Sequence, residues 1–122
     1  MSRRTTAEEY RSLLVDGEGD IQRRIEVACY DLGVEVWRTN SGTARGGKIK
    51  LAPSGTPDLL GYLPKRATRP GLLIAIEVKR PGGTSRTSQI EWHARASASG
   101  VACCFVDNVR DAIAFLKREI AR

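Results

Sequence analysis

Two carboxylates and a lysine are spaced in this sequence so that they could act together on a phosphate group. Residues 72–83 read LLIAIEVKRPGG, a run of five apolar residues followed by Glu77 and Lys79 two positions apart. Side chains at this spacing in a strand point to the same face. Asp58 begins a second apolar run, DLLGYL (58–63). If the two runs pair as an antiparallel hairpin, the start of one lies beside the end of the other, and Asp58 comes next to Glu77 and Lys79.

These three side chains together favour a hard divalent cation and a phosphate. Two neighbouring carboxylates repel and raise each other's pKa unless a positive charge lies between them. Mg²⁺ or Mn²⁺, which take oxygen ligands, would supply that charge. Lys79 is useful there if a phosphate and an attacking water are also held, because it would orient or help deprotonate the water, or neutralise developing charge. A Glu–Lys pair alone would be an ordinary surface ion pair, but Asp58 on the adjacent strand favours the chemical role.

The positive charge of the chain is concentrated in its centre. The net charge is +6 over 122 residues, and residues 38–95 hold eleven Lys and Arg residues against three acidic ones. A block this basic suits a polyanion such as nucleic acid. Such contacts would position a duplex and confer little sequence specificity. The residues expected to contact nucleic acid are Arg38, Asn40, Ser41, Arg45, Lys48, Lys50, Lys65, Arg66, Arg69, Arg80 and Arg86.

Composition excludes several other classes of protein. No apolar run approaches the ~20 residues of a membrane span, and the N-terminal residues lack the apolar segment of a secretory signal. The three cysteines form no C-x-x-C pair and there is one histidine, which disfavours a zinc or cysteine-based enzyme. We therefore expect a cytoplasmic protein with buried, reduced thiols and no membrane partner.

The periodicity of apolar residues predicts an α/β fold. Residues 1–17 read as a polar arm, residues 40–50 as an exposed, flexible loop, and Trp37 as a core residue. The predicted elements are, in chain order, a helix over about 18–32, strands over 34–38, 58–63 and 72–79, a helix over 87–99, a strand over 101–106 and a helix capped by Asp107 or Asn108 and ending near Ile120. The order α-β-β-β-α-β-α predicts a mixed sheet flanked by helices.

The order and spacing of these motifs resemble the PD-(D/E)xK nuclease superfamily, in which Pro-Asp and Glu-x-Lys lie on paired strands. The closer resemblance is to its small VRR-NUC family, the virus-type replication–repair nucleases. It covers about residues 18–106 and implies a restriction-endonuclease-like sheet in one nuclease domain over 18–122. The matching segments are EGDIQ (18–22), VWRTNSG (36–42), GTPDLL (55–60), IEVKRPGG (76–83), SQ (88–89) and the Gly-Val (100–101) before the last strand.

The resemblance assigns roles to individual residues. Asp58 and Glu77 would ligate the metal, with the backbone carbonyl of Val78 as a further ligand, and Lys79 would be the catalytic lysine. Glu18 and Gln89 match the family's acidic residue on the first helix and its glutamine on the second.

Two of these roles have alternatives in the residues themselves. Glu18 continues the apolar stripe of its helix and could add a metal ligand, but it could instead be a carboxylate stabilised by the helix dipole, and Asp20 competes with it. Gln89 could equally be a polar residue at a helix start. Members of the family commonly have a serine three residues before this glutamine, where this chain has Arg86, so the register of the turn is open.

The function implied is a Mg²⁺- or Mn²⁺-dependent endonuclease that hydrolyses DNA phosphodiester bonds with metal-activated water. Small members of the family resemble Holliday-junction resolvases, which implies a structure-specific enzyme acting on branched DNA as a homodimer, of prokaryotic or phage origin. The alternatives are a non-catalytic nucleic-acid-binding module on the same fold and a sequence-specific restriction-type nuclease. The short chain leaves little room for the readout elements that the last one needs.

Overall fold

The computed structural model describes residues 21–39, 43–50 and 52–122. The predicted polar arm and the candidate residues Glu18, Asn40 and Ser41 lie outside them. The helices and strands are α2 (Ile21–Asp31), β1 (Glu35–Arg38), β2 (Thr43–Ala44), β3 (Ile49–Lys50), β4 (Leu59–Leu63), β5 (Leu72–Val78), α3 (Thr87–Ala98), β6 (Ala102–Val106) and α4 (Val109–Ala121).

The principal sheet has four strands in the order β1-β4-β5-β6. The pairs β1–β4 and β4–β5 are antiparallel and the pair β5–β6 is parallel, so the sheet is mixed. Helix α3 makes the connection between the parallel strands, as a parallel pair requires. With α2 first and α4 last, the sheet and its helices follow the predicted order α-β-β-β-α-β-α, and the prediction of an α/β fold is confirmed.

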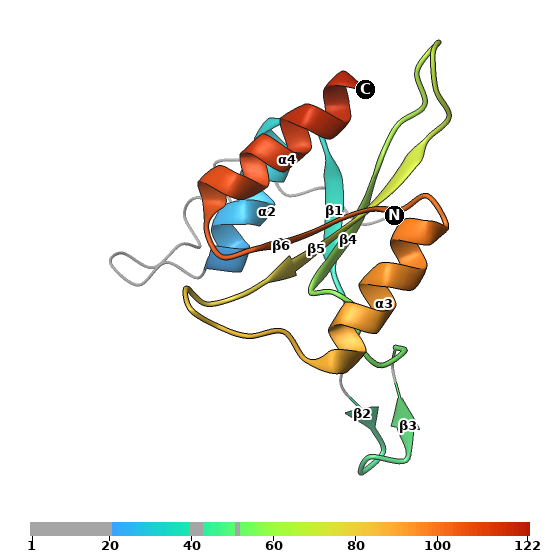
Figure 1. The fold of residues 1–122 in the computed structure, drawn as a ribbon, viewed down its shortest axis with the longest axis vertical. Helices are drawn as coiled ribbons and strands as arrows, with labels where there is room; N and C mark the ends of the chain where they lie inside the picture. The colour runs from blue at the N-terminus through green and yellow to red at the C-terminus, as the bar shows by residue number, and fades with distance from the viewer. Residues whose placement is uncertain (1–20, 40–42, 51) are drawn as a thin grey trace.

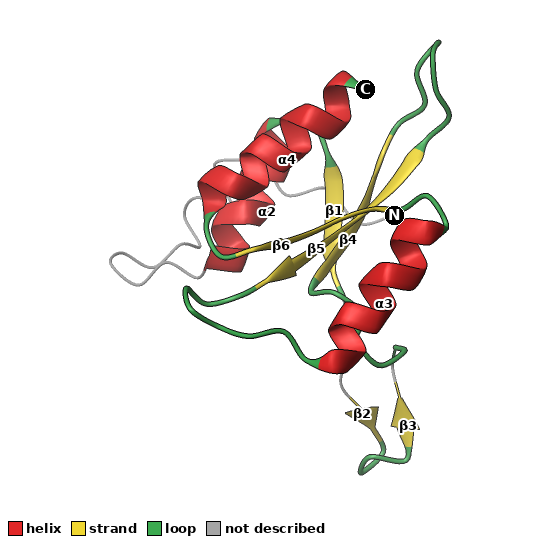
Figure 2. Cartoon of the chain, in the orientation of Figure 1, coloured by secondary structure: helices red, strands yellow, loops and turns green. Residues whose placement is uncertain are grey.

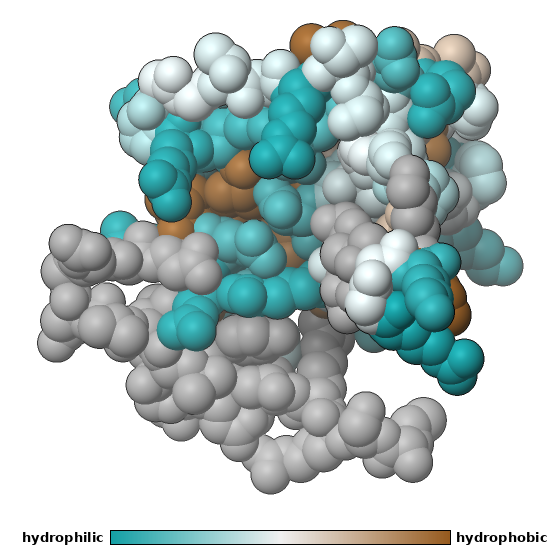
Figure 3. Space-filling view, turned by 90° about the horizontal axis from the view of Figure 1, so that it is seen from below, coloured by the Kyte–Doolittle hydropathy of each residue, from teal (hydrophilic) through white to brown (hydrophobic). Residues whose placement is uncertain are grey.

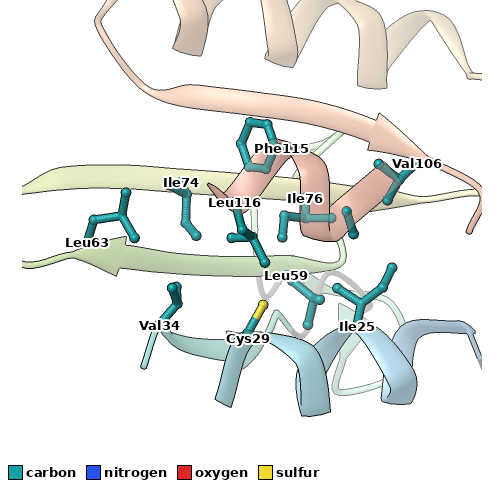
Figure 4. Packing of buried hydrophobic residues seen from close by; sticks show 11 residues of the cluster. Ile25, Cys29, Val34, Leu59, Leu63, Ile74, Ile76, Val106, Phe115 and Leu116 are labelled. Carbon is teal, nitrogen blue, oxygen red and sulfur yellow. The ribbon is translucent and has the colours of Figure 1, made fainter. Parts of the chain in front are cut away.

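The helices cover both faces of the sheet. Helices α2 and α4 lie together on one side and α3 lies on the other (Figures 1 and 2). The core is on the side of α2 and α4, where Ile25 and Cys29 of α2 point toward strand residues such as Leu59 and Ile76 (Figure 4). Because successive strand residues alternate between faces, Glu77, next to buried Ile76, points toward α3.

The predicted start of the first helix lies outside the described residues, and the other predicted ends agree with the structure to within one residue. The cap of α4 is Asn108, whose side chain accepts a hydrogen bond from the backbone N–H of Asp111 at 2.8 Å. No helix in the described part of the chain has the length and apolar character needed to cross a membrane.

Two expectations were wrong in part. Trp37 is 46% exposed and does not belong to the core, because no residue of α3 is buried and this helix covers its side of the sheet incompletely. Within the predicted loop 40–50, residues 43–50 contain β2 and β3, which pair as an antiparallel hairpin. The strands of this hairpin are only two residues long, too short to give the alternation by which strands are recognised in a sequence.

Candidate active site

Asp58 and Glu77 lie at the same end of the sheet, where β4 starts and β5 ends. Leu59 pairs with Ile76 in the antiparallel ladder, so Asp58, one residue earlier, stands opposite Glu77. The backbone N–H of Val78 donates a hydrogen bond to Asp58 Oδ2 at 2.9 Å. The Asp58 carboxylate therefore continues the pairing of the two strands by a side-chain hydrogen bond beyond the last ladder pair.

The segment before Asp58 is fixed from two sides. The backbone N–H of Thr39 donates to Asp58 O at 2.9 Å, and the Thr39 hydroxyl donates to Pro57 O at 2.5 Å. On the other side, Gly55 has φ +85°, and a Cβ built on it would lie 2.0 Å from the carbonyl oxygen of Ser88. Only glycine fits so close to the first turn of α3. These contacts hold Asp58 between the end of β1 and the start of α3.

Gln89 joins the lysine to the buried glutamate. Its Nε2 donates to Glu77 Oε1 at 2.9 Å, and its Oε1 accepts from Lys79 Nζ at 2.5 Å. The same Oε1 accepts from the backbone N–H of Arg86 at 2.9 Å, so Gln89 also caps the first turn of α3. Lys79 Nζ lies 3.7 Å from Glu77 Oε1. Both roles considered for Gln89, contact with the site and helix capping, are therefore combined in one side chain.

Glu77 is held in an environment that disfavours its charge. It is 4% exposed. Burial, with Asp58 as the next largest cause, raises the pKa of Glu77 from 4.5 to about 7, while Lys79 opposes the rise. Glu77 Oε2 is buried and has no hydrogen-bond partner in the described part of the chain. A buried, unpaired carboxylate oxygen beside a second carboxylate is costly unless a cation completes it.

The donor set fits Mg²⁺ or Mn²⁺ better than zinc. Within the described ranges, no group of three or more His, Cys, Asp or Glu side chains comes together. Zinc sites in proteins usually have three or four such ligands. Magnesium is commonly bound by one or two carboxylates, with water and substrate phosphate filling the other positions. Asp58 and Glu77, with the Val78 carbonyl at the end of β5, match the second pattern.

A cavity of about 330 Å³ opens beside Lys79. It is bounded by Arg80, Gly83 and Ser85 on one side and by the end of β6 and the start of α4 on the other. In the view from the end of the molecule at which the hairpin lies, hydrophilic side chains surround a smaller hydrophobic area (Figure 3). Lys79 lines this cavity, whereas Asp58 and Glu77 do not, so the cavity gives solvent access to the lysine side of the site.

The residues expected to contact nucleic acid do not form one surface. Arg80 and Arg86 are exposed on the connection that runs from Lys79 to α3, and Arg45 and Lys48 are exposed on the β2–β3 hairpin. Lys50 is in β3. These five residues lie toward the end of the sheet that carries Asp58.

Three of the remaining basic residues lie at the opposite end of the sheet. Lys65, Arg66 and Arg69 follow β4, five residues at about 3.4 Å each, or roughly 17 Å, from the Asp58 end. The side chain of Arg66 donates to the carbonyl of Ile120, and Arg69 Nε donates to that of Arg122 at 3.0 Å, so both bind the end of α4. Arg38 is at the Asp58 end, since it pairs with Leu59 in the sheet, but its side chain is on the face covered by α2, where it forms an ion pair with the buried Glu26 at 2.9 Å.

Sequence reasoning gave no role to Thr39 and Gly55, which support the site rather than form it. Thr39 and Gly55 fix the Asp58 segment, and only the proximity of Gly55 to the Pro-Asp pair hinted at their role. His93, one turn after Gln89 on α3, stacks on Phe105 with ring centroids 4.0 Å apart, and Phe105 pairs with Glu77 in the parallel ladder. Burial lowers the pKa of His93.

Comparison of the chain with protein-family models, with curated proteins and with solved structures finds no match. The function is therefore inferred from the geometry of the site and from the motifs that compose it.

Proposed function

We propose that this protein is a Mg²⁺- or Mn²⁺-dependent endodeoxyribonuclease that hydrolyses phosphodiester bonds at the site formed by Asp58, Glu77 and Lys79. The observation that carries the proposal is the state of Glu77. Its buried, unpartnered oxygen faces a site with a second carboxylate, and its pKa is raised to about 7 in the absence of a cation. Perturbed carboxylates of this kind cluster at functional sites.

Each residue has a distinct part in the reaction. Asp58 and Glu77 would hold the cation, which supplies charge neutralisation for the phosphate and makes water more acidic. Lys79 has a side chain that is 17% exposed, so its ammonium group can reach a phosphate at the mouth of the site. There it would stabilise the negative charge that grows on the phosphate oxygens as water attacks.

Gln89 would keep the lysine and the glutamate apart. Lys79 and Glu77 form an ion pair at 3.7 Å, and a direct hydrogen bond between them would commit the ammonium group to the carboxylate. Gln89 instead binds both and leaves them 3.7 Å apart, so that two of the three lysine donors remain available. Gln89 is therefore a positioning residue in this proposal.

The substrate we propose is branched DNA. The basic residues Arg45, Lys48, Lys50, Arg80 and Arg86 supply positive charge near the site, and the central charge of the chain suits a polyanion. One small site cuts one strand, and a two-fold homodimer would place two sites on a junction. The resemblance to the VRR-NUC family supports this substrate, a cytoplasmic location and a prokaryotic or phage origin.

The test is cleavage of end-labelled DNA by the purified protein. A four-way junction, a splayed fork, a linear duplex and a single strand would each be incubated with Mg²⁺, Mn²⁺ or EDTA. Lys79→Ala is the test variant and Lys117→Ala, an exposed lysine on α4, is the control. We expect metal-dependent cutting that is lost in Lys79→Ala and kept in Lys117→Ala, with paired symmetric nicks on the junction. Binding without cutting of any substrate would instead identify a non-catalytic DNA-binding module.

A further inference from the structure

The β2–β3 hairpin projects from the body of the protein beyond the first turn of α3 (Figure 1). Its two strands pair through Thr43 with Lys50 and Ala44 with Ile49, and a four-residue turn, Arg45–Lys48, joins them. The residues from Arg45 to Ile49 are all exposed, including the apolar side chain of Ile49. Residues 45–49 of the hairpin therefore contribute nothing to the core of the protein.

The turn of the hairpin is built to bring its backbone close to another surface. Arg45, Gly46 and Gly47 all have positive φ, at 52°, 66° and 87°. A Cβ added at either glycine would meet no atom within 4 Å. These glycines are thus needed for backbone conformation and not for close packing inside the protein, and they leave the tip without side chains between two cationic residues, Arg45 and Lys48.

Arg45 is the single residue other than glycine with positive φ in the described ranges. The left-handed conformation is unfavourable for a residue with a Cβ, and glycine would adopt it without strain. Backbone strain of this kind clusters at sites where a side chain has a function other than stabilising the fold. At an exposed tip, the part of Arg45 that can have such a function is its guanidinium group.

The hairpin is tied to the candidate active site at its base. Thr39, the residue after β1, precedes the hairpin in the chain and is hydrogen-bonded to the backbone of both Pro57 and Asp58. The chain that leaves it reaches Gly55, which packs on Ser88 at the start of α3, and then Asp58 itself. In the sequence, the hairpin therefore lies between two residues, Thr39 and Gly55, whose contacts fix the Asp58 segment.

We propose that residues 43–50 form a β-ribbon arm that lies in the major groove of duplex DNA next to the cleaved bond. A two-stranded ribbon fits the major groove, which is about 12 Å wide, and the glycine tip allows the backbone to approach its floor. Arg45 and Lys48 contact the phosphates on its edges, and Ile49 contributes apolar contact. The groove contact itself is independent of catalysis, but its position beside the cleaved bond rests on the proposed function.

The decisive measurement is the affinity for a fluorescein-labelled duplex, measured by fluorescence anisotropy in EDTA over a series of salt concentrations. The variants are Arg45→Gly, Lys48→Ala and the double variant, and Lys117→Ala on α4 is the charge-matched control. Each lost phosphate contact makes the slope of log K against log salt less steep by about 0.9. A tenfold rise in salt then lowers the affinity of the variant about eightfold less than it lowers that of the wild type. We expect this change for each single variant, about twice the change for the double variant, and only a small change for the control.

Arg45→Gly separates a binding role from a structural one. Because glycine relieves the left-handed strain, the thermal unfolding temperature of Arg45→Gly is expected to equal or exceed that of the wild type, while the DNA affinity of the variant falls.

Methyl green, which occupies the major groove, is expected to displace the protein, whereas netropsin, which occupies the minor groove, is not. Wild-type affinity in the double variant, or displacement by netropsin alone, would overturn the proposal.

The same proteins distinguish failure of this inference from failure of the proposed function. If the wild type cuts DNA in a metal-dependent way and the double hairpin variant cuts equally well, the nuclease function is supported and the role of the hairpin in binding DNA is rejected. If the protein cuts no substrate but binds duplex DNA through the hairpin, the groove contact is supported and the nuclease function is rejected.

Discussion

The backbone N–H of Val78 is hydrogen-bonded to the carboxylate of Asp58 across 2.9 Å, so a residue of the candidate site also joins two strands. The bond fixes Asp58 Oδ2 against β5, directly opposite Glu77 in the register of the ladder. Folding therefore brings the two carboxylates together. Burial, and after it the charge of Asp58, raises the pKa of Glu77.

Glu77 is expected to make the metal-free protein less stable as pH rises. Its pKa is about 7 in the folded state against an ordinary value of 4.5, so folding favours the protonated form. Its effect is absent below pH 4.5, where both states are protonated, grows between 4.5 and about 7, and is constant above. The full cost is about 3 kcal/mol.

Urea unfolding in EDTA across this pH range, with Glu77→Gln compared at each pH, measures that cost. The amide can still accept the hydrogen bond from Gln89 and carries no charge. The difference in unfolding free energy between the two proteins is therefore expected to favour Glu77→Gln by about 3 kcal/mol above pH 7 and to vanish at low pH. If the difference in unfolding free energy between the two proteins does not change with pH, ionisation of Glu77 does not destabilise the folded protein.

A divalent cation is expected to reverse this instability. Binding to the folded state alone stabilises it by about 2.7 kcal/mol when the cation is at a hundred times its Kd. For a domain of this size that corresponds to roughly 10 °C in Tm. Thermal unfolding with Mg²⁺ or Mn²⁺ against EDTA is expected to show the increase in the wild type and in Glu91→Gln, an exposed residue of α3, and not in Glu77→Gln. An equal increase in all three proteins would mean that the cation binds elsewhere.

The main sheet and the pairing of the site were predictable because each depends on local pattern. Alternating or continuous apolar runs marked β4 and β5, and once they were read as a hairpin Asp58 had to meet Glu77. The same hairpin places Lys65 after β4 and therefore at the opposite end of the sheet. The position of Lys65 could therefore be predicted from the sequence. The basic residues were instead grouped by their number in the chain, without regard to which end of the β4–β5 pair each one is on.

Other features depend on contacts between segments far apart in the chain. The exposure of Trp37 follows from how little of the sheet α3 covers, which no pattern in β1 reveals. The close approach of Gly55 to Ser88 joins residues more than thirty positions apart. The hairpin at 43–50 has strands too short for any periodicity to appear. Tertiary packing decided each of these features.

Replacing Gln89 by leucine is expected to impair catalysis while changing the electrostatics of Glu77. Without the amide, the ion pair between Lys79 and Glu77 can become shorter than its present 3.7 Å. The closer lysine would lower the pKa of Glu77 further and would be withdrawn from the substrate. Loss of a residue that orients a site typically costs 10–100-fold in activity or metal affinity, so cleavage is expected to fall by about that factor.

The pH dependence of unfolding separates this role of Gln89 from simple helix capping. A weaker pH dependence than in the wild type, measured in EDTA, is expected for Gln89→Leu and not for Glu91→Gln. A Gln89→Leu protein that loses stability equally at every pH and cuts DNA at the wild-type rate would show that Gln89 only caps α3.

Gly55→Ala is expected to displace the segment that carries Asp58. The new Cβ would lie 2.0 Å from the carbonyl oxygen of Ser88, and φ +85° is strained for alanine. Overpacking and backbone strain together predict a loss of about 2–4 kcal/mol in the free energy of unfolding. Gly46→Ala is the matched control, since Gly46 also has positive φ but faces open space, and strain alone predicts about 1–2 kcal/mol. Urea unfolding of both variants isolates the contact with α3, and equal losses in the two would show that the packing of Gly55 on Ser88 contributes nothing. Because Asp58 moves with its segment, Gly55→Ala is also expected to lose the increase in Tm produced by Mg²⁺, which Gly46→Ala retains.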